Sequence, residues 1–206
     1  PLILNADGSK MSKRDDGAAL TCYMENGYAP EAVLNYLCLL GWSPKDGREV
    51  IPVAELIANF DLPQILRSNA RFDHEKLKWM NGEYLRAMAP DRFYELAVHA
   101  LARAGVDTNQ FPTSYVRAAL DTCMGKLRVF TELPGYGGFY FTEKLELDAE
   151  AKAALTSEAR ERLAKLRAAY AGLADFTATT LEATLKATAQ SLGVKNGVLV
   201  HPARFA

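Results

Sequence analysis

The sequence predicts an all-α fold, in which helical bundles are joined by short turns. Three observations predict it. Apolar residues recur at helical spacing through most of the 206 residues. The apolar–polar alternation of β-strands is nearly absent, and Gly and Pro stand where the apolar stretches begin and end. A chain of this length has room for one large domain or for two to three small ones.

Each expected helix is an apolar stripe between a start signal and a stop signal. Pro30 fits the first turn of a helix, and Gly41 fits the residue that follows its end. Asp73 is a candidate N-cap, and the helix behind it should break at Asn81-Gly82. In chain order, helices are expected at Glu31–Leu40, Val53–Phe60, His74–Trp79, Arg92–Ala104, Thr113–Phe130, Glu158–Ala171 and Leu181–Leu192.

The segments between these helices are expected to be turns and short extended pieces. Pro1–Leu4 is typical of a short apolar strand that enters a glycine turn. Gly135–Gly138 is expected to form a flexible joint, and Val198–Val200 an extended piece after a turn. His201–Ala206 has the pattern of a first helical turn that is then cut. We therefore expect a fragment of a longer protein at both ends.

Composition excludes several classes of protein. The net charge of −1 gives no global attraction for nucleic acid, so any RNA binding must use local patches. The three cysteines are widely spaced and odd in number, which favours a reducing compartment, here the cytoplasm, over disulfides or a zinc site. The apolar run 33–40 is too short to cross a membrane.

The segment Lys10-Met11-Ser12-Lys13-Arg14 carries the strongest chemical signal. Two flexible ammonium groups lie three residues apart beside small residues, as a loop that folds over a triphosphate requires. A Lys-x-x-Lys pair alone is more often solvated charge. We expect Asp15 and Asp16 to pair with Lys13 or Arg14, or to cap the next helix, rather than to bind a metal.

Longer segments carry a family resemblance. Together they are similar to the bacterial and organellar glutamyl-tRNA synthetases, which are class I aminoacyl-tRNA synthetases. The segments are Asn5–Arg14, Gly27–Ser43, Phe72–Leu85 and, more weakly, His201–Arg204.

The resemblance implies a ligase that joins L-glutamate to tRNA(Glu) through a glutamyl-adenylate, with ATP and Mg²⁺. Lys10 and Lys13 match the motif lysines that stabilise the triphosphate and the departing pyrophosphate, with Lys13 as the direct ATP contact. Ile3, Ser12 and Arg14 complete the implied ATP site.

The resemblance also implies that this chain is only part of a catalytic unit. The family's histidine-rich signature is absent, and the three histidines are isolated in the sequence. The glutamate-binding residues and most of the Mg²⁺ site belong to the missing half. We therefore expect the fragment to be inactive alone.

The resemblance divides the chain into three parts. Residues 1–88 would hold the end of the catalytic region and a helical stem-contact domain. Residues 89–148 and 149–206 would be the first part and the truncated second part of an α-helical anticodon-binding domain. The expected protein is a monomer that binds neither DNA nor a membrane.

The implied tRNA contacts are basic residues in the first two parts. They are Lys76, Lys78, Arg86, Lys126 and Arg128. For each of them a solvated helix face, or a cation near a helix C-terminus, is the alternative. We expect Tyr36 and Trp79 to be core residues rather than base-stacking ones.

Two other functions remain open. The first is a glutaminyl-tRNA synthetase, or a glutamyl enzyme that also charges the glutamine tRNA. The second is a stand-alone helical RNA-binding module with no enzymatic parent.

Overall fold

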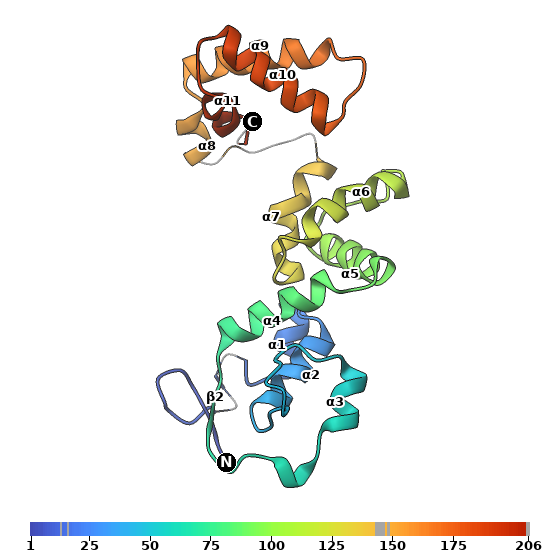
Figure 1. Cartoon of the computed structure of the whole chain (residues 1–206), viewed down its shortest axis with the longest axis vertical. Coiled ribbons are helices and arrows are strands. Elements are labelled where there is room, and N and C mark those ends of the chain that lie inside the picture. The colour runs from blue at the N-terminus through green and yellow to red at the C-terminus, as the bar shows by residue number, and fades with distance from the viewer. Residues whose placement is uncertain (13, 16, 143–146, 148, 205–206) are drawn as a thin grey trace. The chain divides into compact units, whose positions relative to one another are not determined.

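The structure is a computed structural model that describes residues 1–12, 14–15, 17–142, 147 and 149–204. Most of these residues are helical, which confirms the all-α prediction. The chain divides into two compact units, Pro1–Glu143 and Lys144–Ala206 (Figure 1). Over the described ranges, no helix has both the length and the apolar character that a membrane crossing requires.

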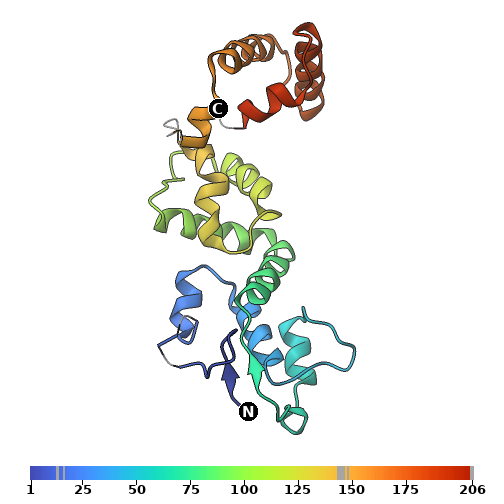
Figure 2. The ribbon, with the colours of Figure 1, turned by 90° about the vertical axis from the view of Figure 1, so that its left-hand side faces the viewer.

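The first half of unit 1 contains two short strands and several helices. Helices α2 and α4 pack against each other, and between them lies a core that includes Tyr36, Phe72 and Met80. Figure 2 shows the two strands side by side near the N-terminus. The elements are β1 (Ile3–Leu4), α1 (Leu20–Glu25), α2 (Pro30–Leu39), α3 (Val53–Asn59), the 3-10 turn η1 (Leu62–Gln64), β2 (Ala70–Arg71) and α4 (His74–Arg86).

Helix α4 begins where the sequence predicts and ends later. The Asp73 carboxylate accepts the Lys76 N–H at 3.0 Å, as an N-cap does. The expected break at Asn81-Gly82 is wrong, because the helix continues to Arg86. Tertiary packing holds it there: Asn81 is fully buried and hydrogen-bonded, and at Gly82 an added Cβ would stand 3.4 Å from the Leu127 carbonyl oxygen.

Trp79, on the same helix, corrects a second expectation. Its side chain is 41% exposed, so it is not a core residue. Tyr36 is 2% exposed, as expected, and its hydroxyl accepts the Asp73 N–H at 2.6 Å. The helix therefore turns Trp79 outward while it buries its neighbours Leu77 and Met80.

The second half of unit 1 is a bundle around Phe93, Leu120 and Leu133. The predicted helix Thr113–Phe130 is wrong beyond Met124, because the chain then leaves the helix to bury Leu127 and Phe130 in that core. The elements are α5 (Pro90–Arg103), α6 (Thr113–Met124), η2 (Phe130–Glu132), α7 (Leu133–Gly137) and η3 (Gly138–Phe141).

The glycines of the expected joint lie inside α7 and η3. Gly137 is buried where a Cβ would stand 2.8 Å from the Cys123 sulfur. This residue therefore serves close packing of α7 on α6, and the expectation of a flexible joint is wrong.

Unit 2 is a small helical bundle around Leu166, Ala189 and Leu199. Val198–Val200 is helical rather than extended, because the carbonyls of Lys195 and Asn196 accept its N–H groups and Leu199 is fully buried. The elements are α8 (Ala149–Ala154), α9 (Ser157–Ala171), α10 (Ala178–Ser191) and α11 (Gly197–Ala203).

Candidate functional site

The basic loop near the N-terminus starts from a three-segment mini-sheet. Strands β1 and β2 are parallel, with Leu4 opposite Arg71. On its other side, Leu4 forms an antiparallel bridge with Lys10. The Met11 N–H donates to the Ile3 carbonyl at 3.0 Å, and the Asn69 side chain accepts the Leu2 N–H at 2.8 Å. Lys10 is thus held in register with β1.

A tight turn closes the tip of this loop, which we call the signature loop (Asn5–Asp15). The Asn5 N–H donates to the Ser9 carbonyl at 2.8 Å, and Gly8 adopts a φ of 88°. The Asp7 carboxylate accepts the Ser9 hydroxyl at 2.7 Å and the Ser9 N–H at 2.9 Å. These hydrogen bonds, the one from the hydroxyl first, lower the pKa of Asp7 below its ordinary value.

Asp15 closes the base of the signature loop. Its carboxylate accepts the Asn5 amide at 2.9 Å, and the Ser12 N–H and hydroxyl, each at 2.8 Å. The bond from Asn5, followed by those from Ser12, lowers the pKa of Asp15. Asp15 and Arg14 are both among the described residues and form no ion pair, so the expectation that they pair is wrong. Asp15 does not cap the next helix either, because α1 begins at Leu20 and its N-cap residue is Ala19. Lys13 and Asp16 lie outside the described residues.

The described cations of this loop are available to an anion. Lys10 and Arg14 are both exposed. In the part of the chain that the structure describes, neither has a carboxylate within ion-pair distance. The Ser12 hydroxyl also accepts the Arg14 N–H at 3.2 Å, so this side chain is engaged in hydrogen bonds within the loop. The arrangement presents positive charge on a loop whose carboxylates are already engaged.

The basic residues predicted for RNA lie along α4 and after α6. Lys76 pairs with Glu49 at 2.5 Å, Lys78 pairs with Glu132 at 2.8 Å, and Arg86 pairs with Glu83. Arg128 is brought to α4, where its guanidinium lies 3.8 Å from Glu75. Lys126 is exposed just beyond the end of α6.

Two residues that sequence reasoning missed hold this surface together. The Asn81 amide accepts the Ala29 N–H at 2.8 Å and donates to the Arg128 carbonyl at 2.5 Å. Glu132 accepts the N–H of Arg128 at 2.9 Å in addition to Lys78. No local pattern could have indicated the contacts of Asn81 or the Lys78–Glu132 pair, because these partners lie about fifty positions apart in the sequence.

The Lys78–Glu132 pair shifts both pKa values toward the charged forms. Partial burial alone would raise the pKa of Glu132, but the hydrogen bonds from Lys78 and from the Arg128 N–H outweigh burial and lower it. The hydrogen bond to Glu132 raises the pKa of Lys78. The pair is therefore ionised over the whole neutral range.

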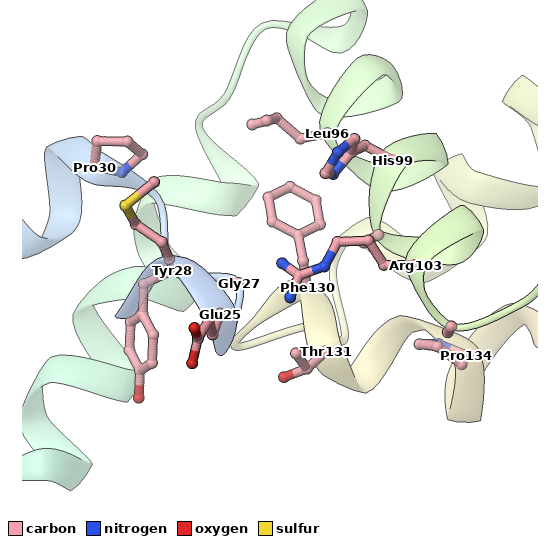
Figure 3. A pocket seen from close by; sticks show the side chains of 13 residues that line it. Glu25, Gly27, Tyr28, Pro30, Leu96, His99, Arg103, Phe130, Thr131 and Pro134 are labelled. Carbon is pink, nitrogen blue, oxygen red and sulfur yellow. The ribbon is translucent and has the colours of Figure 1, made fainter. Parts of the chain in front are cut away.

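Unit 1 also contains a cavity of about 380 Å³ between the end of α1, helix α5 and η2 (Figure 3). Its floor is apolar and includes Phe130, while His99 and Arg103 extend from α5 and Glu25 from the end of α1. None of the residues predicted for ATP or RNA lines it. The cavity and the signature loop are thus separate features.

Comparison with known proteins gives a consistent result along the chain. Residues 92–206 match the anticodon binding domain model, and residues 1–79 match the model of the catalytic domain of class I tRNA synthetases (E and Q). Glutamate–tRNA ligases of Methylacidiphilum infernorum and Akkermansia muciniphila are 39% and 40% identical over 100% of this chain. The chain spans 47% and 46% of their lengths, so just under half of each relative is matched.

Solved structures agree with these relatives. A glutamate tRNA ligase from Elizabethkingia meningosepticum, crystallised in complex with its amino acid, superimposes with a TM-score of 0.82 at 28% identity. The match covers 98% of this chain and 43% of that one. The glutamate–tRNA synthetase of Elizabethkingia anophelis gives a TM-score of 0.78 at 27% identity, over 98% of this chain and 43% of that one.

Proposed function

The chain belongs to the glutamyl-tRNA synthetase family, with an anticodon binding domain over residues 92–206, and from this premise we propose that it is the tRNA-binding part of a glutamate–tRNA ligase. The ligase would activate L-glutamate with ATP and transfer it to tRNA(Glu). The observation that carries the proposal is the signature loop. The loop is bridged to β1 through Lys10. Among the described residues, Lys10 and Arg14 have no carboxylate partner, so both can bind the phosphates of a nucleotide.

We propose that this chain contributes charge stabilisation to adenylate formation. The glutamate carboxylate attacks the α-phosphorus of ATP, and pyrophosphate leaves with the developing negative charge. Lys10 and Lys13 would meet that charge, while Ser12 and Arg14 shape and extend the loop. The backbone of Ile3, whose carbonyl accepts the Met11 N–H at 3.0 Å, would meet the adenine edge.

We propose that magnesium is bound mainly by the part of the ligase that lies outside this chain. In the described ranges, no group of three or more His, Cys, Asp or Glu side chains is placed to bind a metal ion. The Asp7 and Asp15 carboxylates already accept hydrogen bonds from Ser9, Asn5 and Ser12. We therefore assign no step of the reaction to a magnesium ligand in these residues.

We further propose that the chain binds tRNA through the three parts 1–88, 89–148 and 149–206. Lys76, Lys78 and Arg86 would contact phosphates from α4, which fixes the register of the RNA without reading its sequence. Lys126 and Arg128 would lie toward the anticodon. A guanidinium reads a base edge through two parallel hydrogen bonds, so Arg128 is the better candidate for base recognition.

The test uses the full-length ligase that carries this segment. Lys10→Ala and Lys13→Ala should each lower glutamate-dependent ATP–pyrophosphate exchange by about 10-fold to 100-fold, because a lost charge-assisted contact costs ~1.5–3 kcal/mol. Affinity for tRNA should stay within about twofold. Lys45→Ala, a lysine outside the loop, is the matched control. Equal losses in exchange and in tRNA affinity would contradict the role given to the loop.

A second measurement separates the related ligases. Charging of purified tRNA(Glu) and tRNA(Gln) by the full-length protein should favour tRNA(Glu). Equal rates would instead identify an enzyme of relaxed specificity, and the absence of any charging would favour an RNA-binding module.

A further inference from the structure

Arg71 lies in the same row of the mini-sheet as Lys10. Leu4 is opposite Arg71 on one side and opposite Lys10 on the other. Residues that are directly opposite each other in a sheet share a face. Met11, the neighbour of Lys10, belongs to the other face and packs on the buried core around Phe72. Arg71 and Lys10 therefore stand on the face that turns away from this core.

Hydrogen bonds to β1 and to the residue before β1 flank Arg71 on both sides. Before it, the Asn69 side chain accepts the Leu2 N–H at 2.8 Å. After it, the Phe72 N–H donates to the Leu4 carbonyl at 2.8 Å, and the Phe72 ring is 3% exposed. The arginine thus stands on a strand that is hydrogen-bonded to β1.

The guanidinium of Arg71 reaches the tip of the signature loop. A Cβ at Gly8 would stand 3.7 Å from its Nη2 atom. Gly8 has no side chain to cover the guanidinium, and its φ of 88° disfavours any other residue there. The guanidinium is therefore left uncovered by this turn at the tip of the loop, where the one carboxylate of the turn, Asp7, already accepts hydrogen bonds from Ser9.

Arg71 also differs from the cations of α4. Lys76, Lys78 and Arg86 each have a carboxylate partner. Arg71 is exposed and, within the described residues, has no carboxylate at ion-pair distance. A charge left unpaired on a fixed strand is available to a ligand anion.

The spacing of Arg71 and Lys10 suits one extended anion. Adjacent segments of a sheet are about 4.8 Å apart, so the two Cα atoms are about 10 Å apart. Two long side chains can close that gap on the same polyphosphate, with the guanidinium gripping two oxygens at once. An RNA phosphate is the less favoured source, because the row belongs to the loop face and not to α4.

We propose that Arg71 is a third phosphate-binding cation of the ATP site, which grips the terminal phosphates of the nucleotide beside Lys10. This inference rests on the proposed ligase function. It adds a residue from outside the Lys-Met-Ser-Lys-Arg motif, about sixty positions further along the chain.

The experiment compares three variants of the full-length ligase, with tRNA(Glu) present throughout. Arg71→Ala should lower kcat/KM for ATP in pyrophosphate exchange by about tenfold, mostly through a higher KM. Arg71→Lys should recover part of the loss, because it keeps the charge without the planar fork. Arg67→Ala removes an exposed arginine just before β2 and should leave the kinetics unchanged.

The outcomes separate the two proposals. Suppose that the wild-type ligase shows exchange. If Arg71→Ala is then unaffected, or if Arg71→Ala and Arg67→Ala lose equally, the role of Arg71 is overturned and the proposed function is not. A variant with normal kinetics for ATP but weaker tRNA binding assigns Arg71 to an RNA phosphate and also overturns it. No glutamate-dependent exchange by the wild-type ligase overturns the proposed function and this inference with it.

Discussion

Replacing Asn81 with alanine should destabilise unit 1 far more than its polar character suggests. Asn81 is 0% exposed in the middle of α4. Its amide joins that helix to two other segments, through the Ala29 N–H at 2.8 Å and the Arg128 carbonyl at 2.5 Å. Alanine keeps the helix but removes both bonds.

The expected cost follows from the two groups left behind. Ala29 is 1% exposed, so its N–H cannot reach water and would cost about 1–3 kcal/mol if unpaired. Arg128 is exposed, so its carbonyl can be hydrated, and losing that bond costs about 1 kcal/mol. Asn81→Ala should therefore lower the free energy of unfolding by about 2–4 kcal/mol.

Tryptophan fluorescence during urea denaturation measures this cost in unit 1. Both tryptophans of the chain, Trp42 and Trp79, belong to that unit. With an m-value of about 2 kcal/mol/M, the midpoint should fall by about 1–2 M. Asn59→Ala, an exposed asparagine at the end of α3, is the control and should change the free energy by less than about 0.5 kcal/mol. Equal shifts for the two variants would mean that water replaces the Asn81 amide, and the reasoning would fail.

Two further changes test the contacts between the halves of unit 1. Gly27→Ala should cost about 2–4 kcal/mol in urea denaturation, because φ is 74° and the new Cβ would stand 2.8 Å from the Phe130 Cβ. Gly47→Ala has a φ of 73° and open space, so it should cost only about 1 kcal/mol, and similar costs would exclude the Phe130 contact. Glu132→Gln should cost about 1 kcal/mol at pH 7. Because folding lowers the pKa of Glu132, its contribution is present above the unfolded pKa of about 4.3 and is lost as the pH falls through the folded value. The wild-type protein and the Glu132→Gln variant should thus converge in unfolding free energy once the pH has fallen below the folded-state pKa of Glu132, and a gap that does not narrow as the pH falls would contradict the ion pair.

Local signals predicted the helices whose ends are set locally. The sequence placed α2 between Pro30 and Gly41, and the N-cap of α4 at Asp73, because caps and breakers act within a few residues. It failed at Asn81-Gly82 and at Val198–Val200, where distant contacts decide the conformation. A buried asparagine with partners from other segments outweighs its weak preference for a helix interior.

The candidate site divides in the same way. The Lys-Met-Ser-Lys-Arg motif is contiguous, so Lys10 and Arg14 could be found from the sequence alone. Arg71 could not, because only the register of β2 on β1 brings it to the loop. The role of Asp15 was also hidden, since a carboxylate beside two cations suggests an ion pair, whereas the folded loop points it at Ser12 and Asn5.

The ion pairs along α4 indicate which of its lysines can more easily exchange a carboxylate partner for an RNA phosphate. A surface pair contributes about 0–1 kcal/mol, less than the ~1.5–3 kcal/mol of a charge-assisted bond, so an exposed lysine can exchange its carboxylate for a phosphate. Lys76 fits this exchange, because Glu49 has no other partner among the described residues and is 46% exposed. Lys78 fits it less well, because Glu132 is only 26% exposed and also accepts the Arg128 N–H. Removing Lys78 from Glu132 would leave a half-buried carboxylate without its cation at the junction of α4 and η2. Within the proposed function, Lys76 is therefore the stronger RNA contact of the two, because a phosphate contact of Lys78 competes with its pair to Glu132.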